Sequence, residues 1–230
     1  MMNEQQIFLA TETGFVLAEQ AGEKWCVVRR GVNGRFLTSI MAREGFFLAG
    51  SQDGILSSAD LGRTWQPSNS GLSQRHVRWL AFHPDISDFE LAGTEPAAIF
   101  VSRDGGERWQ ELHEVADLRD QFGWWLPYSP AAGAVRGFAI QGERGFAGGL
   151  VGGRLRSDDG GLSWQLAGGS SGEPRFVTPA AGLLHADAHS VTLHPTTADF
   201  VYAPTGGGFY RSWDGVESWR GMETNGYSRA

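Results

Sequence analysis

The sequence has 230 residues, 41% of them hydrophobic, which is enough to bury a substantial core. Its formal net charge of −7 argues against binding to nucleic acid through bulk electrostatics, and no stretch approaches the ~20 apolar residues of a membrane span. The single cysteine, Cys26, excludes an intrachain disulfide, and we expect a buried, unreactive thiol. The N-terminus is acidic and does not resemble a signal peptide, so we expect a soluble, cytoplasmic protein.

Short apolar segments alternate with turn residues along the chain, which predicts antiparallel β structure. Pairs of strands separated by a short loop are expected at 8–10 and 15–17, 47–49 and 55–57, 90–92 and 99–101, 145–147 and 154–156, and 201–203 and 209–211. A further strand precedes four of these pairs, at 36–42, 77–84, 135–141 and 189–195. Only the segment from Glu111 to Asp120 has a pattern that also suits a helix.

Each strand pair ends in an octapeptide of the form S-x-D-x-G-x-x-W. The defining positions of the four best copies are Ser58, Asp60, Gly62 and Trp65; Ser102, Asp104, Gly106 and Trp109; Ser157, Asp159, Gly161 and Trp164; and Ser212, Asp214 and Trp219, the last copy lacking the glycine. The aspartate and serine can accept hydrogen bonds from N–H groups of a turn, and the glycine supplies a positive φ. The tryptophan then opens the next strand with a large apolar surface. Each octapeptide therefore predicts a hairpin corner.

The tryptophans of these corners recur every 40 to 55 residues, at Trp25, Trp65, Trp109, Trp164 and Trp219, with an eroded copy of the octapeptide around the first. A period in this range indicates a repeat architecture. With the strand that follows each tryptophan, most repeats contain four strands, which is typical of a blade of a β-propeller. We therefore predict one all-β propeller domain over residues 1–230. The octapeptide resembles the Asp-box, or BNR, repeat of sialidases, sortilin-type receptors and photosystem-assembly propellers, and this resemblance implies a structural role for the octapeptides.

The first repeat starts directly at its second strand, and the C-terminal residues 225–230 stand where an innermost strand would begin. We therefore expect this tail to complete the first blade and to close a ring of five blades. The alternative is a fragment of a longer propeller with six to eight blades.

Alignment of the innermost strands predicts a group of basic side chains at one mouth of the central channel: Arg78, Arg136, His189 and, from the tail, Arg229. Converging guanidinium groups favour a carboxylate, sulfate or phosphate, and sialidases are similar in using an arginine cluster to hold a sugar carboxylate. The alternative is that carboxylates of nearby loops neutralise the arginines. The candidates for this structural role are Glu12, Asp53, Glu95 and Asp187.

Two further patterns suggest a ligand site. The loop that contains Trp124, Trp125 and Tyr128 offers aromatic rings for stacking on a sugar or peptide, although the same rings suit a loop that folds back as an apolar cap. His185, Asp187 and His189 alternate in the sequence, but alternate residues of a straight strand are ~7 Å apart, too far for one ion. We therefore predict neither a metal nor a cofactor.

These features favour a non-catalytic binding or scaffold propeller that recognises a protein partner or a small anionic or carbohydrate ligand at the channel mouth. The alternative is a glycoside hydrolase of the sialidase type. The resemblance to sialidases would then assign an acid role to Asp187 or Glu95 and a nucleophile role to Tyr128 or Tyr227. The chain lacks an Arg-Ile-Pro segment like the one that sialidases carry, which favours the binding role.

Overall fold

The computed structural model describes residues 5–125 and 133–223. They form five antiparallel sheets, each built from strands that are consecutive in the sequence. We call each sheet a blade and number the blades along the chain. Blade 1 has three strands, β1 (Gln6–Thr11), β2 (Gly14–Ala21) and β3 (Lys24–Gly31). Blades 2 and 3 have four strands each: β4 (Leu37–Arg43), β5 (Phe46–Ser51), β6 (Gly54–Ser58) and β7 (Gln66–Pro67); β8 (Val77–Phe82), β9 (Glu90–Thr94), β10 (Ile99–Ser102) and β11 (Gln110–Leu112). Blades 4 and 5 also have four: β12 (Gly137–Gln141), β13 (Arg144–Leu150), β14 (Gly153–Ser157) and β15 (Gln165–Leu166); β16 (Thr192–His194), β17 (Thr197–Thr205), β18 (Gly208–Ser212) and β19 (Arg220–Met222).

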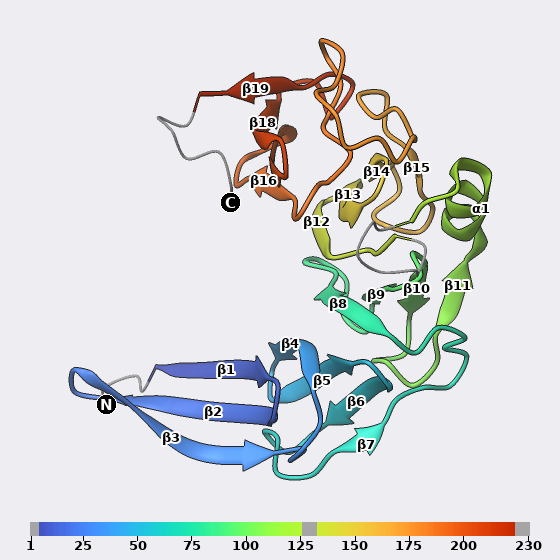
Figure 1. Ribbon diagram of the computed structural model, residues 1–230. Coiled ribbons are helices and arrows are strands. Elements are labelled where there is room, and N and C mark those ends of the chain that lie inside the picture. The colour runs from blue at the N-terminus through green and yellow to red at the C-terminus, as the bar shows by residue number, and fades with distance from the viewer. Residues whose placement is uncertain (1–4, 126–132, 224–230) are drawn as a thin grey trace.

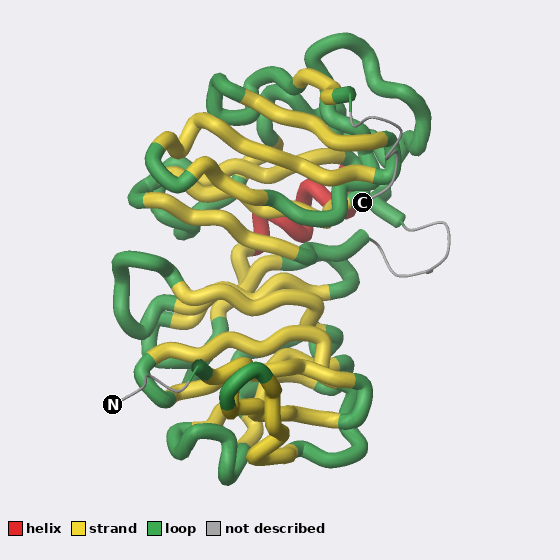
Figure 2. The backbone as a smooth tube through the Cα atoms, turned by 90° about the vertical axis from the view of Figure 1, so that its left-hand side faces the viewer, coloured by secondary structure: helices red, strands yellow, loops and turns green. Residues whose placement is uncertain are grey.

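The blades follow one another along an open arc, with blade 1 at one end and blade 5 at the other (Figure 1). Seen from the side, the blades are stacked one above the next, and the strands of neighbouring blades run in roughly the same direction (Figure 2). The prediction of five consecutive antiparallel blades is confirmed. Blade 1 starts at the strand equivalent to the second strand of the other blades, as the repeat alignment predicts. The segment 225–230 that we expect to close a ring lies outside the described residues.

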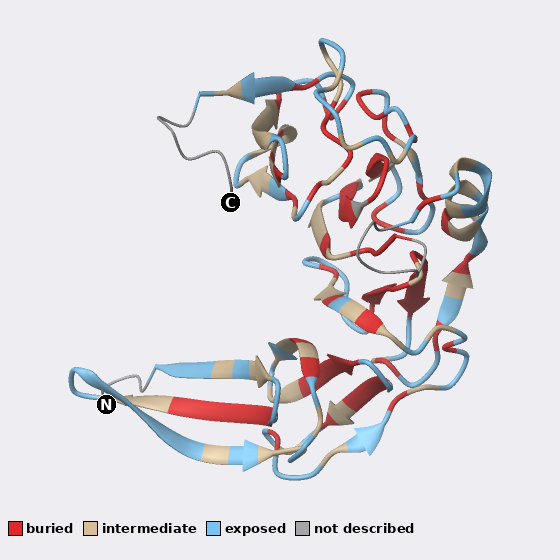
Figure 3. Ribbon diagram, viewed as in Figure 1, coloured by how far each residue is buried: buried red, intermediate tan, exposed pale blue. Residues whose placement is uncertain are grey.

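Apolar residues fill the interfaces between neighbouring blades. Adjacent residues of one strand project to opposite faces of its sheet, and the middle strands of blades 2 to 4 are buried along most of their length (Figure 3). In β5, Leu48 packs toward blade 3 while Ala49 packs toward blade 1. In β9, Leu91 packs toward blade 4 and Ala92 toward blade 2. Each interface thus has its own core cluster, and together the clusters hold the arc.

The octapeptides form the corners that their sequence predicts. In the corner of blade 4, Ser157 Oγ donates to Asp159 Oδ1 at 2.7 Å and accepts the N–H of Gly161 at 2.8 Å. Asp159 Oδ1 also accepts the N–H groups of Leu162 and Ser163, at 3.0 and 2.9 Å. The serine and aspartate bonds recur at the corners of blades 2, 3 and 5. Each corner is therefore held by one serine and one aspartate that satisfy the N–H groups of the turn.

The long connection between blades 3 and 4 contains α1 (His113–Phe122), close to the segment that suits a helix in the sequence. The helix buries Val115 in the core between blades 3 and 4 and ends at Gly123, whose φ of 61° is left-handed. Leu118 and Phe122 pack against the same core, so the helix covers the outer side of this interface. No helix in the described part of the chain is long and apolar enough to cross a membrane.

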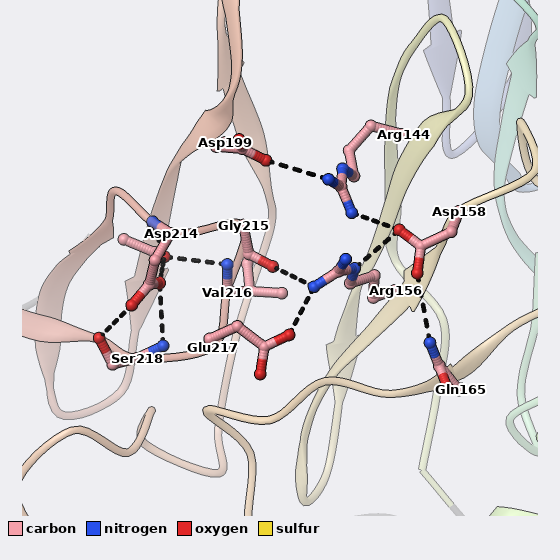
Figure 4. A network of polar contacts seen from close by, with 11 residues as sticks. Arg144, Arg156, Asp158, Gln165, Asp199, Asp214, Gly215, Val216, Glu217 and Ser218 are labelled. Atoms are coloured by element: carbon pink, nitrogen blue, oxygen red, sulfur yellow. Dashed lines mark hydrogen bonds and ion pairs between the residues drawn. The ribbon is translucent and has the colours of Figure 1, made fainter.

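A network of charged side chains joins the corners of blades 4 and 5 (Figure 4). Arg156 Nε contacts Asp158 Oδ1 at 2.9 Å within blade 4, and Arg156 Nη1 contacts Glu217 Oε1 at 2.5 Å in blade 5. Arg144 makes a parallel link, with Nη1 on Asp158 and Nη2 at 3.4 Å from Asp199 Oδ1. Polar contacts thus join these two blades at their exposed edge, beyond the apolar core.

The expectation of a buried cysteine is wrong, because Cys26 is exposed. It lies in β3, the outermost strand of the terminal blade, where neighbouring Trp25 and Val27 are also exposed. No described blade packs on the outer face of this sheet, so its apolar side chains remain in contact with solvent.

Candidate functional site

The innermost strands of blades 2 to 5 bring three of the predicted basic residues to one cavity. Arg78 lies in β8, Arg136 immediately precedes β12, and His189 lies just before β16. The cavity has a volume of about 380 Å³, and we call it the arginine cavity. Its other lining residues are Phe36, Leu37, Thr38 and Trp79. Since Arg78, Arg136 and His189 come from three successive blades, the repeat geometry itself assembles the group.

Two of these basic residues have acidic neighbours among the candidates for structural neutralisation. Arg78 Nη1 is 3.5 Å from Glu95 Oε2, and the Glu95 side chain is buried. His189 Nε2 is 3.3 Å from Asp187 Oδ2. Within the described ranges, no ion pair links Glu12 or Asp53 to an arginine. Pairing therefore accounts for part of the positive charge of the cavity.

Arg136 differs from Arg78, because no ion pair connects it to a carboxylate in residues 5–125 and 133–223. Its Nε atom is buried and has no hydrogen-bond partner in the same part of the chain. The stem of the side chain lies against Gly149, where an added Cβ would approach Arg136 Cβ to 2.4 Å. Arg136 thus adds a cationic side chain to the cavity lining, and its buried Nε–H has no partner in the described part of the chain.

His76 lies close to the same group, with Nε2 3.4 Å from Arg78 Nη1. Burial lowers the pKa of His76; the charges of Arg78 and Arg136 lower it further, while Glu95 opposes them. The imidazole is therefore neutral at neutral pH, so one of its ring nitrogens can accept a hydrogen bond.

Arg154, which no sequence motif marks as a site residue, is a second cation in blade 4. It is fully buried, its Nη2 donates to the carbonyl of Ser190, and burial lowers its pKa to about 9. A Cβ on Gly148 would lie 1.9 Å from Arg154 Nη1, so the guanidinium occupies the space that this glycine leaves. Alignment of the repeats could have marked Arg154 as unusual, because the equivalent positions at the start of the third strand are apolar in the other blades: Phe15, Ile55, Ile99 and Phe209.

The aromatic loop is divided between core and surface. Trp124 is 1% exposed, stacks with Phe122 at 6.4 Å between ring centroids, and donates from Nε1 to the carbonyl of Gly172 at 2.7 Å. Its ring is part of the core and is not free to stack on a ligand. This is the arrangement expected of a loop that folds back as an apolar cap. Trp125 is 49% exposed and meets Phe176 edge to face. Tyr128, Tyr227 and Arg229 lie outside the described residues.

The His185-Asp187-His189 segment is organised around its own backbone. His185 is buried, and its Nδ1 accepts the N–H of Asp187 at 3.2 Å. Burial lowers the pKa of His185, although the Asp187 carboxylate opposes this effect. In the described part of the chain, no group of three or more histidine, cysteine, aspartate or glutamate side chains has a geometry that could hold a metal ion.

No known protein family matches the sequence, and no curated protein is significantly similar to it. Solved structures are similar in fold. An ancestral GH74 enzyme shares 18% identity over 89% of this chain and 26% of its own, with a TM-score of 0.64. The GH74 xyloglucanase from Xanthomonas campestris shares 15% identity over 96% of this chain and 36% of its own, with a TM-score of 0.58. YCF48 bound to D1 peptide shares 15% identity over 97% of this chain and 71% of its own, with a TM-score of 0.56.

The fold is a β-propeller. This chain spans about a quarter and about a third of the two GH74 enzymes, and most of YCF48. At these identities the similarity concerns the backbone architecture. Within that architecture, the arginine cavity lies among the innermost strands of four propeller blades.

Proposed function

We propose that this protein is a non-catalytic binding propeller whose arginine cavity receives a carboxylate of a protein partner or of a small anionic ligand. The observation that carries the proposal is the convergence of Arg78, Arg136 and His189 on one cavity, together with the buried, unpartnered Nε of Arg136. A carboxylate accepts two parallel hydrogen bonds from a guanidinium, so it suits this donor in both charge and shape.

Two further points support the proposal. One structural neighbour, YCF48, was solved bound to a peptide, so a propeller of related architecture does bind a peptide. The serine and aspartate bonds at the corners also fit the Asp-box or BNR repeat, to which we propose to assign this chain. Such corners would serve as a rigid frame for the site at the opposite mouth of the channel.

A sialidase-like hydrolase is less well supported. The residues with an acid role in that alternative, Glu95 and Asp187, lie beside Arg78 and His189, respectively. Both carboxylates therefore fit a role in orienting the basic side chains.

Calorimetric titration with acetyl-trialanine, which has a free C-terminal carboxylate, and with its C-terminal amide tests the proposed function. We expect the acid to bind and the amide not to bind. Arg136→Gln should weaken binding of the acid about 10- to 100-fold, because a hydrogen bond between charged groups is lost. Arg63→Gln is the matched control, since Arg63 is an exposed arginine of a corner, and it should change the affinity by less than about twofold.

Equal binding of acid and amide, or full affinity in Arg136→Gln, would contradict the carboxylate site. A fluorogenic sialoside assay separates the two functions. We expect no turnover, whereas turnover that is lost in Arg136→Gln would favour the hydrolase.

A further inference from the structure

Glu90 is a buried acid at a position that is apolar or glycine in every other blade. It opens β9 and lies opposite Ser102, the first residue of a corner octapeptide. The equivalent partners of the first corner residue in the other blades are Ile7, Phe47, Gly145 and Val201. Glu90 is 2% exposed, and it lies on the same face of β9 as Ala92, toward blade 2.

A cavity occupies the interface at this point. At the interface between blades 1 and 2, the ring of Phe47 fills the equivalent space and meets Phe8 and Phe15 edge to face. Between blades 2 and 3, Glu90 instead lines a cavity of about 640 Å³, which we call the Glu90 cavity. Glu90 Oε2 is buried and has no hydrogen-bond partner in the described part of the chain. A buried carboxyl oxygen without a partner is costly, which points to a missing donor.

The charge of the cavity is strongly negative. Its ionisable lining residues are Arg43, Glu44, Asp88, Glu90, Asp104 and Glu107, five acids and one base. The base is already engaged, because Arg43 donates to the carbonyls of His83 and Ile86 and lies 4.6 Å from the ring centroid of Phe82. In residues 5–125 and 133–223, no ion pair joins Arg43 to Glu90. An additional cation would therefore be attracted to this cavity.

The walls indicate what kind of cation fits. Phe46, Pro67 and Phe82 supply apolar surface, on which a weakly hydrated, planar guanidinium packs better than an ammonium or a metal ion. No group of three acids or histidines in the described ranges suits a metal. We propose that the Glu90 cavity binds a guanidinium group, either of an arginine side chain in a partner protein or of a small guanidinium compound.

This site is separate from the arginine cavity. Strand β8 connects the two, with Arg78 and Trp79 near its start in the arginine cavity and Phe82 at its end in the Glu90 cavity. The two cavities also have opposite charge. A propeller with both sites would present a cationic and an anionic site on opposite faces, and each site can be removed without the other.

Guanidinium binding requires ionised Glu90 and should therefore depend on pH. Burial raises the pKa of Glu90 to about 7, with a bond from the Ser102 side chain opposing, Asp88 and Asp104 adding to the rise, and Arg43 lowering it. Glu44 and Glu107 face the same cavity from the neighbouring turns. Because a proton competes with the guanidinium for Glu90, affinity should rise as the pH increases from 6 to 8.

The test is a calorimetric or NMR titration at pH 8 with acetyl-Gly-Arg-Gly-amide, with the same peptide carrying citrulline, which has the shape of arginine but no charge, and with methylguanidinium. We expect the arginine peptide to bind and the citrulline peptide not to bind.

Glu90→Gln should weaken binding of the arginine peptide at least tenfold. Glu23→Gln is the matched control, because Glu23 is an exposed glutamate in the turn between β2 and β3, outside the cavity, and it should weaken binding less than threefold. If methylguanidinium binds as tightly as the peptide, the ligand is a small guanidinium compound. If the peptide binds clearly more tightly, the ligand is a protein partner.

Equal binding of arginine and citrulline peptides would overturn the proposal, as would unchanged affinity in Glu90→Gln. The pH dependence tests the wild-type protein without any substitution. Affinity that stays constant between pH 6 and pH 8 would also overturn the assignment to Glu90.

Discussion

Glu90 places an ionisable group at a position of the repeat that is apolar or glycine in the other blades. Its neighbours along β9 are buried and apolar, as in the other blades, so the strand forms and packs normally. The carboxyl group is carried into the interface by the alternation of the strand, and burial raises its pKa from 4.5 to about 7. At neutral pH, Glu90 is therefore divided between its neutral and ionised forms.

Glu90 should make the stability of the protein depend on pH. Because its pKa is higher in the folded state, the folded protein holds a proton that the unfolded chain has released, and the free energy of unfolding falls as the pH rises from about 4.5 to about 7. The loss should be on the order of 2 to 3 kcal/mol. Urea denaturation at pH 5 and pH 8 measures it. Glu90→Gln should remove most of this difference, and an unchanged difference would assign it to other groups.

Individual site residues differ in how far the sequence predicts them. Arg78, Arg136 and His189 can be placed by counting along aligned innermost strands, because equivalent positions of the repeat lie at the same level in neighbouring blades and here line one cavity. Trp124 could not be placed in this way, since its burial depends on how a long connection packs against blades 3 and 4. Arg154 and Glu90 stand at positions that are apolar or glycine in the other blades, so alignment of the repeats marks them as unusual, whereas the cavity beside Glu90 and the contact between Arg154 and Gly148 are visible only in the structure.

At the scale of elements, the corners explain why so short a motif can predict so much. The serine and aspartate bonds are local, within four residues in the sequence, so they form regardless of how blades pack. In blade 5, Val216 takes the place of the glycine and has a φ of 69°. The side-chain bonds are retained there, with the N–H of Val216 3.0 Å from Ser212 Oγ. The corner therefore depends more on its serine and aspartate than on its glycine.

Loss of a corner aspartate should destabilise the protein. Asp159→Ala leaves the N–H groups of Leu162 and Ser163 without their acceptor. We expect the free energy of unfolding to fall by about 1 to 2 kcal/mol, measured by urea denaturation at pH 7. Asp158→Ala is a matched control, because the neighbouring Asp158 makes exposed ion pairs with Arg144 and Arg156 and should cost less than about 1 kcal/mol. Equal costs would show that the aspartate does not hold the turn.

The molecule as a whole is a row of blades in which each blade packs mainly on its neighbours, because a separate core cluster lies at each interface. The stability of such an array is approximately a sum of blade and interface contributions. Blade 3 has a packed neighbour on both sides, and all residues of β9 and β10 are buried. In blade 1, by contrast, β1 is mostly exposed or half-buried.

Hydrogen exchange should therefore be graded along the arc. We expect the amides of β9 and β10 to exchange slowest and those of β1 to exchange faster, by at least about tenfold, because β1 is exposed or half-buried and should open at lower free energy. Peptide-resolved hydrogen–deuterium exchange with mass spectrometry measures the gradient. Equal protection of β1 and β9 would mean that blade 1 opens only together with the whole domain.

The close approach of Gly148 and Arg154 constrains how this part of blade 4 can change. Any larger residue at position 148 would displace the Arg154 guanidinium. The displaced cation would then have to enter the packed interior or move out to solvent. Conversely, a shorter residue at position 154 would leave a void beside the glycine. The two positions are thus coupled, and a variant library should accept larger residues at position 148 more readily when position 154 changes as well.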